Sequence, residues 1–207
     1  MVPLCECPKS ALDLIPEAEC KEDFGVVRRL AFSRKKLFQG VTSPATTSTI
    51  IELAEWANTL AATDDTLTIV TPLIDNVIST PGDHKTQEVS QRTEKRGLLP
   101  TMIDAIMLSA KGEVIEAFKK LQCEKVLYVY FFNEDEQIIC ADYGTDGPGG
   151  FKLSQSTFGM QDTVFDGTTP DSDNNALQFQ LKQDWSDKKT VLDANFDPLT
   201  ELSNGSS

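Results

Sequence analysis

The cysteines near the N-terminus are the residues whose type and spacing come closest to a chemical site. Cys5, Cys7 and Cys20 could supply thiolates, which bind zinc at short spacings. Structural zinc sites usually pair their ligands as Cys-x2-Cys, a spacing that none of the five cysteines shows. A fourth ligand would have to be Cys123, Cys140 or the single histidine, His84. We therefore expect buried or free reduced thiols and no metal, with zinc as the alternative.

Other catalytic and binding motifs are incomplete. Residues 171–175 (Asp-Ser-Asp-Asn-Asn) begin like a calcium-binding loop, but Ala176 and Lys182 replace the glycine and the closing glutamate that an EF-hand needs. A solvated turn is expected there, with a non-specific cation site as the alternative. The chain has no phosphate-binding loop, dinucleotide-binding glycine pattern or nucleophile elbow. Only a Cys–His pair stays open, because its members meet in space. We expect no catalytic residue, no cofactor and no enzyme.

Charge argues against one class of function. The chain has 40% hydrophobic and 25% charged residues, as soluble globular proteins do, but its formal net charge is −13. A surface of that sign repels phosphate backbones. Free DNA or RNA binding is therefore not expected as the main function.

Positive charge is concentrated in one short segment. Residues 28–36 hold five bases and no acid, whereas residues 133–207 hold 14 acids and four lysines. Two such edges could join copies of the chain by charge complementarity, and a solvated, unpaired face is the alternative. The candidates for a subunit interface are Arg28, Arg29, Arg34, Lys35 and Lys36.

Neither a secretory leader nor a membrane helix is expected. The N-terminus lacks a basic region followed by an apolar one. No apolar run approaches the roughly 20 residues that a membrane helix needs. The odd number of cysteines fits a reducing compartment. We expect a protein made and kept in a cytoplasm, or in a particle assembled there, with no membrane partner.

The stretch from residue 109 to residue 143 is the best candidate for the centre of the fold. It predicts a helix with one apolar face, a strand at 126–132, a polar turn and a return strand at 137–143. The strand at 126–132 carries no charge, so both of its faces need cover. Residues 177–182 alternate apolar and polar, which predicts a half-buried strand. The core candidates are Val114, Phe118, Leu121, Leu127, Val129, Phe131, Leu177, Phe179 and Leu181.

The remaining segments predict short elements joined by loops. Strands are expected at 26–32, 67–78, 98–108 and 151–165, a helix at 50–60 and a polar hairpin tip at 86–96. A helix also fits 98–108, but pairing with 67–78 favours a strand. The fold class is α+β and mostly β, a sandwich or barrel packed by one or two short helices. We expect an irregular N-terminal arm at 1–25, a single domain at 26–183 and an extended C-terminal arm at 184–207. Within that arm, residues 184–199 are expected to form either a last acidic strand or an extended segment.

This order of elements is similar to that of the tail tube proteins of tailed bacteriophages. A long two-stranded section with a polar tip spans residues 67–108 and is followed by a helix, a hairpin and closing strands. The amino-acid sequence of residues 25–32, 121–130 and 184–200 resembles that of virion structural proteins from phages of Bacteroidetes hosts, including crAss-like phages. The resemblance implies a sandwich packed by one helix, whose subunits join edge to edge into a ring.

The expected function follows from this resemblance. We expect a non-enzymatic virion protein that self-assembles into a ring, hexameric or higher, or into a tube in the tail or neck. DNA would pass through it without specific binding, because an acidic inner wall repels phosphates. Other virion proteins are the expected partners, and the virion, assembled in the host bacterial cytoplasm, is the expected location. The alternatives are a capsid decoration or fibre-attachment protein, and a small cytoplasmic metal- or ligand-binding enzyme.

Overall fold

The computed structural model describes residues 25–38, 47–89, 92–108, 110–154, 157–164 and 174–202. Within these residues the chain is mostly β, with two large antiparallel sheets, a separate two-stranded sheet and a few short helices, so the predicted class of α+β and mostly β is confirmed. The predicted N-terminal arm lies almost wholly outside the described residues.

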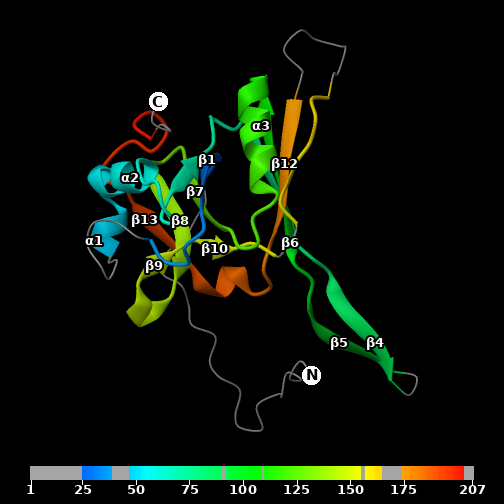
Figure 1. Ribbon diagram of the computed structural model, residues 1–207. Helices are drawn as coiled ribbons and strands as arrows, with labels where there is room; N and C mark the ends of the chain where they lie inside the picture. The colour runs from blue at the N-terminus through cyan, green and yellow to red at the C-terminus, as the bar shows by residue number, and fades with distance from the viewer. Residues whose placement is uncertain are drawn as a thin grey trace.

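A seven-stranded sheet lies at the centre of the molecule (Figure 1). Its order is β13 (Lys189–Asp193), β8 (Gln137–Asp142), β7 (Tyr128–Asn133), β1 (Val27–Ser33) and β2 (Thr68–Val70), with β9 (Pro148–Gly149) beside β8 and β10 (Phe151–Lys152) beside β7. A four-stranded sheet has the order β11 (Gly159–Met160), β12 (Asn174–Leu181), β6 (Thr101–Leu108) and β3 (Asn76–Thr80). β4 (His84–Val89) and β5 (Arg92–Leu98) form a separate two-stranded sheet.

Short helices cover the outer layers. α1 (Thr47–Ile50) and α2 (Leu53–Leu60) lie on one side of the seven-stranded sheet, and α3 (Gly112–Leu121) lies with the four-stranded sheet on the other (Figure 1). Single 3-10 turns occur at η1 (Gly144–Asp146) and η2 (Trp185–Lys188). None of the helices among the described residues is long and apolar enough to cross a bilayer.

Strand β7 is buried on both faces, as its uncharged sequence predicts. All six of its residues are buried. Val129 and Phe131 belong to the core between the two large sheets, whereas Tyr130 and Phe132 belong to a second core under α1 and α2. Because successive side chains of a strand point to opposite faces, this central strand joins the two cores.

The first core fills the space between the two large sheets. Phe32 of β1 contacts Phe179 of β12 edge-on, with ring centroids 5.7 Å apart, and lies 6.4 Å from Phe118 of α3. β12 alternates between half-buried and buried residues along its whole length. The candidates Phe118, Leu127, Val129, Phe131, Leu177, Phe179 and Leu181 are buried in this core, and Val114 and Leu121 pack against it.

The second core lies on the opposite face of the seven-stranded sheet. Trp56 of α2 is fully buried and packs on Tyr130 and Phe132, at ring distances of 5.4 and 5.2 Å. Its indole N–H donates to the carbonyl of Ile50 at 2.7 Å. That bond spans a break at Glu52, whose backbone is extended, so the single helix predicted at 50–60 is two short helices instead.

Cys140 of β8 lies in this second core, and its thiol should not react with alkylating reagents. Burial raises the pKa of its thiol from the ordinary 9.0 to about 12, and the nearby Asp142 adds to the shift. Because the thiolate is the reactive form, we expect a maleimide at pH 8 to label the exposed Cys123 and to spare Cys140 until urea unfolds the chain. Peptide mapping by mass spectrometry reads both sites. Equal labelling of the two without urea would show that the second core does not shield Cys140 of β8 from solvent.

The chain changes sheets between β2 and β3. The backbone N–H of Ile74, two residues after Pro72, donates to the carbonyl of Arg28 in β1 at 2.7 Å. One residue later, the N–H of Asp75 donates to Ile106 of β6 at 2.9 Å. Residues 67–78 are therefore two strands in two sheets, while the predicted pairing with 98–108 is confirmed between β3 and β6.

A second change of sheets divides residues 151–165. The N–H of Leu153 donates to Leu127 beside the seven-stranded sheet at 3.0 Å, and the N–H of Ser154 donates to Gln180 of β12 at 2.7 Å. β10 and β11 consequently lie in different sheets, and the single strand predicted here is wrong.

The C-terminal segment is part of the fold as far as residue 202. β13 pairs with β8 along five residues and forms an edge of the seven-stranded sheet. Phe196 and Leu202 are 6% and 1% exposed in the second core. Of the last strand or extended arm expected at 184–199, the structure therefore shows the strand, within a segment whose apolar residues complete the cover of the central sheet. Residues 203–207 lie outside the described residues.

Candidate functional site

The bases predicted to form a subunit edge mostly pair within their own chain. Arg34 makes two bonds to Glu124, one of them at 3.0 Å. Lys35 lies 2.5 Å from Asp65. Lys36 lies 3.3 Å from Asp146. The complementarity expected between copies is therefore found inside one chain at these positions.

Arg28 and Arg29 point to different parts of the molecule. Arg28 donates to the carbonyl of Asp75 at 2.7 Å and faces Glu134 at 3.4 Å. The half-buried Arg29 donates to the carbonyls of Pro198, at 3.0 Å, and Leu202. Burial lowers the pKa of Arg29, although the charge of Asp197 opposes the shift. Arg29 thus holds the C-terminal segment against the sheet and does not lie on a free edge.

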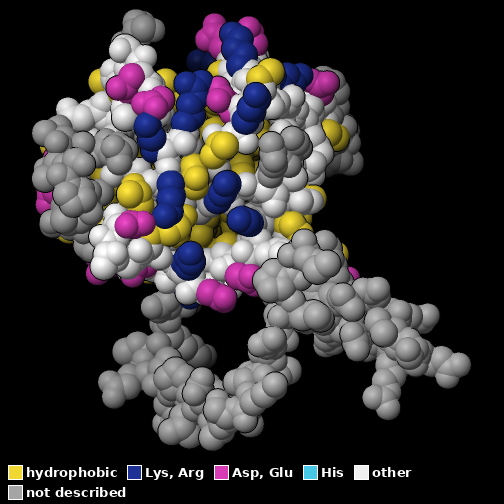
Figure 2. Space-filling model, turned by 60° about the horizontal axis from the view of Figure 1, so that its bottom comes forward, with side chains coloured by type: hydrophobic (Ala, Val, Ile, Leu, Met, Phe, Trp, Pro, Cys, Tyr) yellow, Lys and Arg dark blue, Asp and Glu magenta, His cyan; other side chains and the backbone are white. Residues whose placement is uncertain are grey.

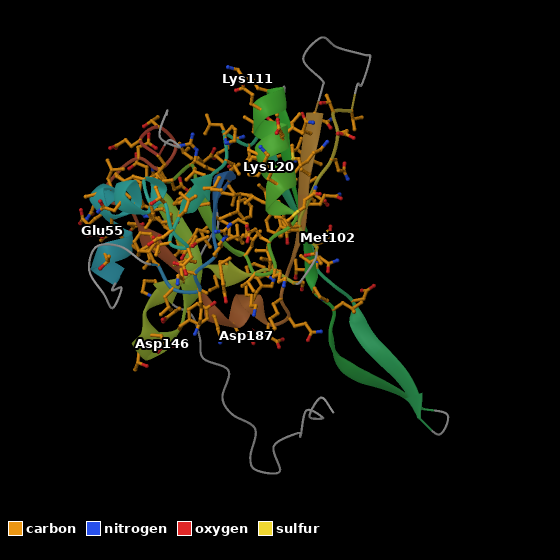
Figure 3. The ribbon with its side chains drawn as sticks, viewed as in Figure 1. Glu55, Met102, Lys111, Lys120, Asp146 and Asp187 are labelled. Atoms are coloured by element: carbon orange, nitrogen blue, oxygen red, sulfur yellow. The ribbon has the colours of Figure 1, made fainter. Side chains whose placement is uncertain are left out.

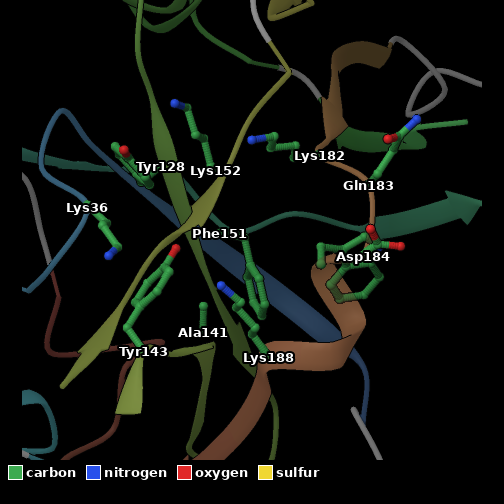
Figure 4. A pocket seen from close by; sticks show the side chains of 11 residues that line it. Lys36, Tyr128, Ala141, Tyr143, Phe151, Lys152, Lys182, Gln183, Asp184 and Lys188 are labelled. Carbon is green, nitrogen blue, oxygen red and sulfur yellow. The ribbon is translucent and has the colours of Figure 1, made fainter. Parts of the chain in front are cut away.

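A different basic surface forms where four separate segments meet. An open pocket of about 520 Å³ is rimmed by four lysines, one each from the loop after β1, β10, the residue after β12 and η2 (Figure 4). Aromatic rings supply much of its wall. The lysines are Lys36, Lys152, Lys182 and Lys188, and the aromatic residues are Tyr128, Tyr143, Phe151 and Trp185. We call this surface the lysine pocket.

Backbone contacts fix the lysines in place. The N–H of Lys182 donates to the carbonyl of Lys152 at 3.1 Å, which sets the two residues side by side. Lys36 accepts a bond from the N–H of Gly150 at 3.1 Å. A side chain at Gly149 would bring its Cβ within 2.1 Å of the Lys36 carbonyl, so the close approach requires glycine there. The rim is therefore held by main-chain contacts between separate segments.

Tyr143 forms the centre of the aromatic wall. Its hydroxyl donates to the carbonyl of Gly150 at 2.8 Å. The ammonium of Lys36 lies 4.1 Å from its ring centroid and that of Lys188 lies 5.3 Å from it, and the two flank the ring in Figure 4. Burial raises the pKa of Tyr143 to about 12, so its phenol stays neutral and adds no negative charge.

Trp185 and Phe151 form the adjoining wall. Their rings meet edge to face with centroids 5.3 Å apart. The indole N–H of Trp185 donates to the hydroxyl of Thr101 at 3.0 Å, which fixes the ring. Both rings are thus held in place before any ligand arrives.

The pocket is positive on an acidic chain. Asp184 also lines it, and Asp146 pairs with Lys36 at its rim. Figure 2 shows Lys and Arg side chains gathered around an apolar hollow on this face. Lys36 belongs to the basic segment that the sequence singles out. Lys152, Lys182 and the Lys188–Lys189 pair are scattered through the acidic C-terminal half, so no local charge pattern reveals them.

The predicted metal and catalytic candidates are not brought together. Cys5, Cys7, Cys20 and residues 171–173 lie outside the described residues, as does the side chain of His84. In the part of the chain that the structure describes, no three His, Cys, Asp or Glu side chains are grouped as metal ligands. The absence of a metal and of a catalytic residue stays a prediction.

Comparisons with known proteins give no relative. No family model, curated protein or solved structure matches the chain. Its function is therefore inferred from its residues and their geometry.

Proposed function

We propose that the chain is a non-enzymatic structural subunit of a phage virion that self-assembles into a ring or tube in the tail or neck. One observation carries the proposal. β4 and β5 form a two-stranded sheet that projects from the body, and among the described strands they pair only with each other (Figure 1). An isolated two-stranded hairpin is marginally stable in water, so this one is suited to packing against another molecule.

The base of the hairpin is anchored in the body. The N–H of Leu99 donates to the carbonyl of Asp83 at 2.8 Å, which closes the hairpin where it leaves the four-stranded sheet. A Cβ at Gly82 would lie 2.3 Å from the Leu99 carbonyl, so only glycine fits this crossing. A fixed base gives the projecting strands a fixed direction.

The edge of the four-stranded sheet offers a place for such a hairpin to bind. β3 is the last strand of that sheet, and its sequence Asn-Val-Ile-Ser-Thr carries no charge and no proline. Proteins usually protect exposed edges with charge, proline or a cover. Leu73 and Ile78, before and within β3, are 57% and 45% exposed. The edge can therefore accept a strand from a neighbouring copy.

A hairpin on one copy and an edge on the next are different surfaces. Contacts of this heterologous kind close into rings or continue as helical tubes, rather than stopping at a two-fold dimer. The order of elements that resembles tail tube proteins supports the virion setting, with other virion proteins as partners and DNA passing through the ring. The formal net charge of −13 suits a wall to which DNA does not adhere.

Deleting the hairpin should abolish assembly. We expect the full chain to form rings or tubes in negative-stain micrographs, and a variant with residues 84–98 replaced by a short Gly-Ser turn to remain monomeric. The body should keep its melting temperature, because the hairpin forms a sheet of its own. Light scattering coupled to size exclusion gives the mass of each.

A pair of point variants tests the edge. Ile78→Lys places a charge on β3 and should weaken assembly, whereas Val164→Lys at a residue that is 51% exposed elsewhere should not. If the full chain stays monomeric at all concentrations, self-assembly is wrong and a decoration or fibre-attachment role, in which the hairpin grips another protein, replaces it.

A further inference from the structure

We propose that the lysine pocket binds a free phosphorylated ligand with a planar ring, of the nucleotide class. This goes beyond assembly, because the pocket uses neither the hairpin nor β3. A volume of about 520 Å³ falls in the range of roughly 300–1,000 Å³ typical of small-molecule sites. The two halves of the ligand correspond to two parts of the pocket, the lysine rim and the aromatic wall.

Three of the four rim lysines supply charge that no described carboxylate pairs, whereas Lys36 is paired with Asp146. Among the described residues, no carboxylate pairs with Lys152, Lys182 or Lys188, although the chain is rich in acids. Like charges held side by side repel, and an anion between them relieves that repulsion. Lysine ammonium groups bind phosphate as point charges from several directions, which suits a ligand with more than one phosphate.

The wall supplies rings for a planar group. Trp185 is half-buried, and its ring is fixed by Phe151 on its side and by Thr101 at its indole N–H. Any nucleobase can stack on such a ring, because every base has a π-face. Tyr143 stays protonated because burial raises its pKa, so it does not repel a phosphate beside it.

The charge of the whole chain favours a free ligand over a nucleic-acid strand. A net charge of −13 repels a long polyanion whose phosphates extend beyond the pocket. A free nucleotide places its few phosphates within the rim, where the lysines dominate.

The test compares ligands that carry the phosphates alone, the planar ring alone, or both. Calorimetry at low salt uses ATP, adenosine, inorganic tripolyphosphate and a short thymidine oligonucleotide. We expect ATP to bind about tenfold more tightly than either adenosine or tripolyphosphate, since stacking and charge each contribute. ATP should also quench tryptophan fluorescence, because Trp185 lines the pocket while Trp56 is buried in the second core.

Variants assign the binding to the pocket. The double variant Lys152→Gln and Lys182→Gln should lose about tenfold in ATP affinity through lost charge-assisted contacts. Its matched control, Lys111→Gln with Lys120→Gln on and beside α3, should not, since Figure 3 shows these lysines far from Asp146 and Asp187 at the pocket side. Trp185→Ala should reduce ATP affinity and leave tripolyphosphate affinity unchanged. The hairpin-deleted variant should bind ATP as the full chain does.

Three results would overturn the proposal. Tripolyphosphate binding as tightly as ATP would reduce the site to a simple anion site. An oligonucleotide binding more tightly than ATP would make a strand the ligand. No binding of any probe, with all variants folded by melting temperature, would remove the site altogether.

Discussion

Replacing Phe32 with alanine is expected to lower the free energy of unfolding by about 3–5 kcal/mol. Phe32 is 1% exposed and packs against residues from three parts of the chain. Its ring centroid lies 5.7 Å from that of Phe179, 5.2 Å from Phe158 and 6.4 Å from Phe118. Truncation would leave a cavity where both sheets and α3 meet, and rigid strands on two sides limit its collapse. Urea denaturation followed by tryptophan fluorescence measures the loss.

An exposed residue provides the control for this substitution. Val126, just before β7, is 41% exposed, so Val126→Ala should change the free energy of unfolding by less than about 0.5 kcal/mol. If Phe32→Ala costs no more than the control, the two sheets do not share one core and the sandwich arrangement is incorrect.

The parts of the fold that sequence predicts well are those with a strong local pattern. Because the sequence of β7 carries no charge, it predicts a strand that is buried on both faces. The alternation of apolar and polar residues in β12 predicts a strand with one buried face. The apolar face of α3 places Phe118 toward the core. Each of these patterns is complete within one element, so it needs no knowledge of neighbours.

The parts that sequence misses depend on partners far along the chain. Residues 67–78 and 151–165 look continuous, and only the backbone bonds to Arg28 and Gln180 reveal where each segment changes sheets. The lysine pocket is hidden for the same reason. Lys152 and Lys182 are 30 positions apart and become neighbours through backbone bonds between the segment after β10 and the end of β12.

The arginines of β1 show how a local charge pattern misleads. Arg28 and Arg29 are adjacent in sequence and suggest a joint role at an interface. Arg28 bonds toward β3, whereas Arg29 bonds the carbonyls of the C-terminal segment. Two identical substitutions at these positions should therefore have unequal consequences.

Arg29→Glu should destabilise the monomer by about 3 kcal/mol, because it removes charge-assisted bonds in a half-buried site. The new carboxylate would face the carbonyls of Pro198 and Leu202 and the charge of Asp197. Repulsion there should release the C-terminal segment from the second core, which limited proteolysis detects as early cleavage after residue 193.

Arg28→Glu serves as the matched variant, one residue away. Arg28 also donates to a carbonyl, that of Asp75, but this bond is exposed, and the pair with Glu134 has side chains 36% and 46% exposed. The loss should therefore be about 1 kcal/mol, with no new cleavage. Both variants replace a positive charge with a negative one on the same strand, so a general charge effect would weaken both equally. Equal losses would show that Arg29 does not hold the C-terminal segment. The expected inequality instead assigns Arg29 to the interior of one chain, and the proposed assembly then rests on the hairpin and the β3 edge alone.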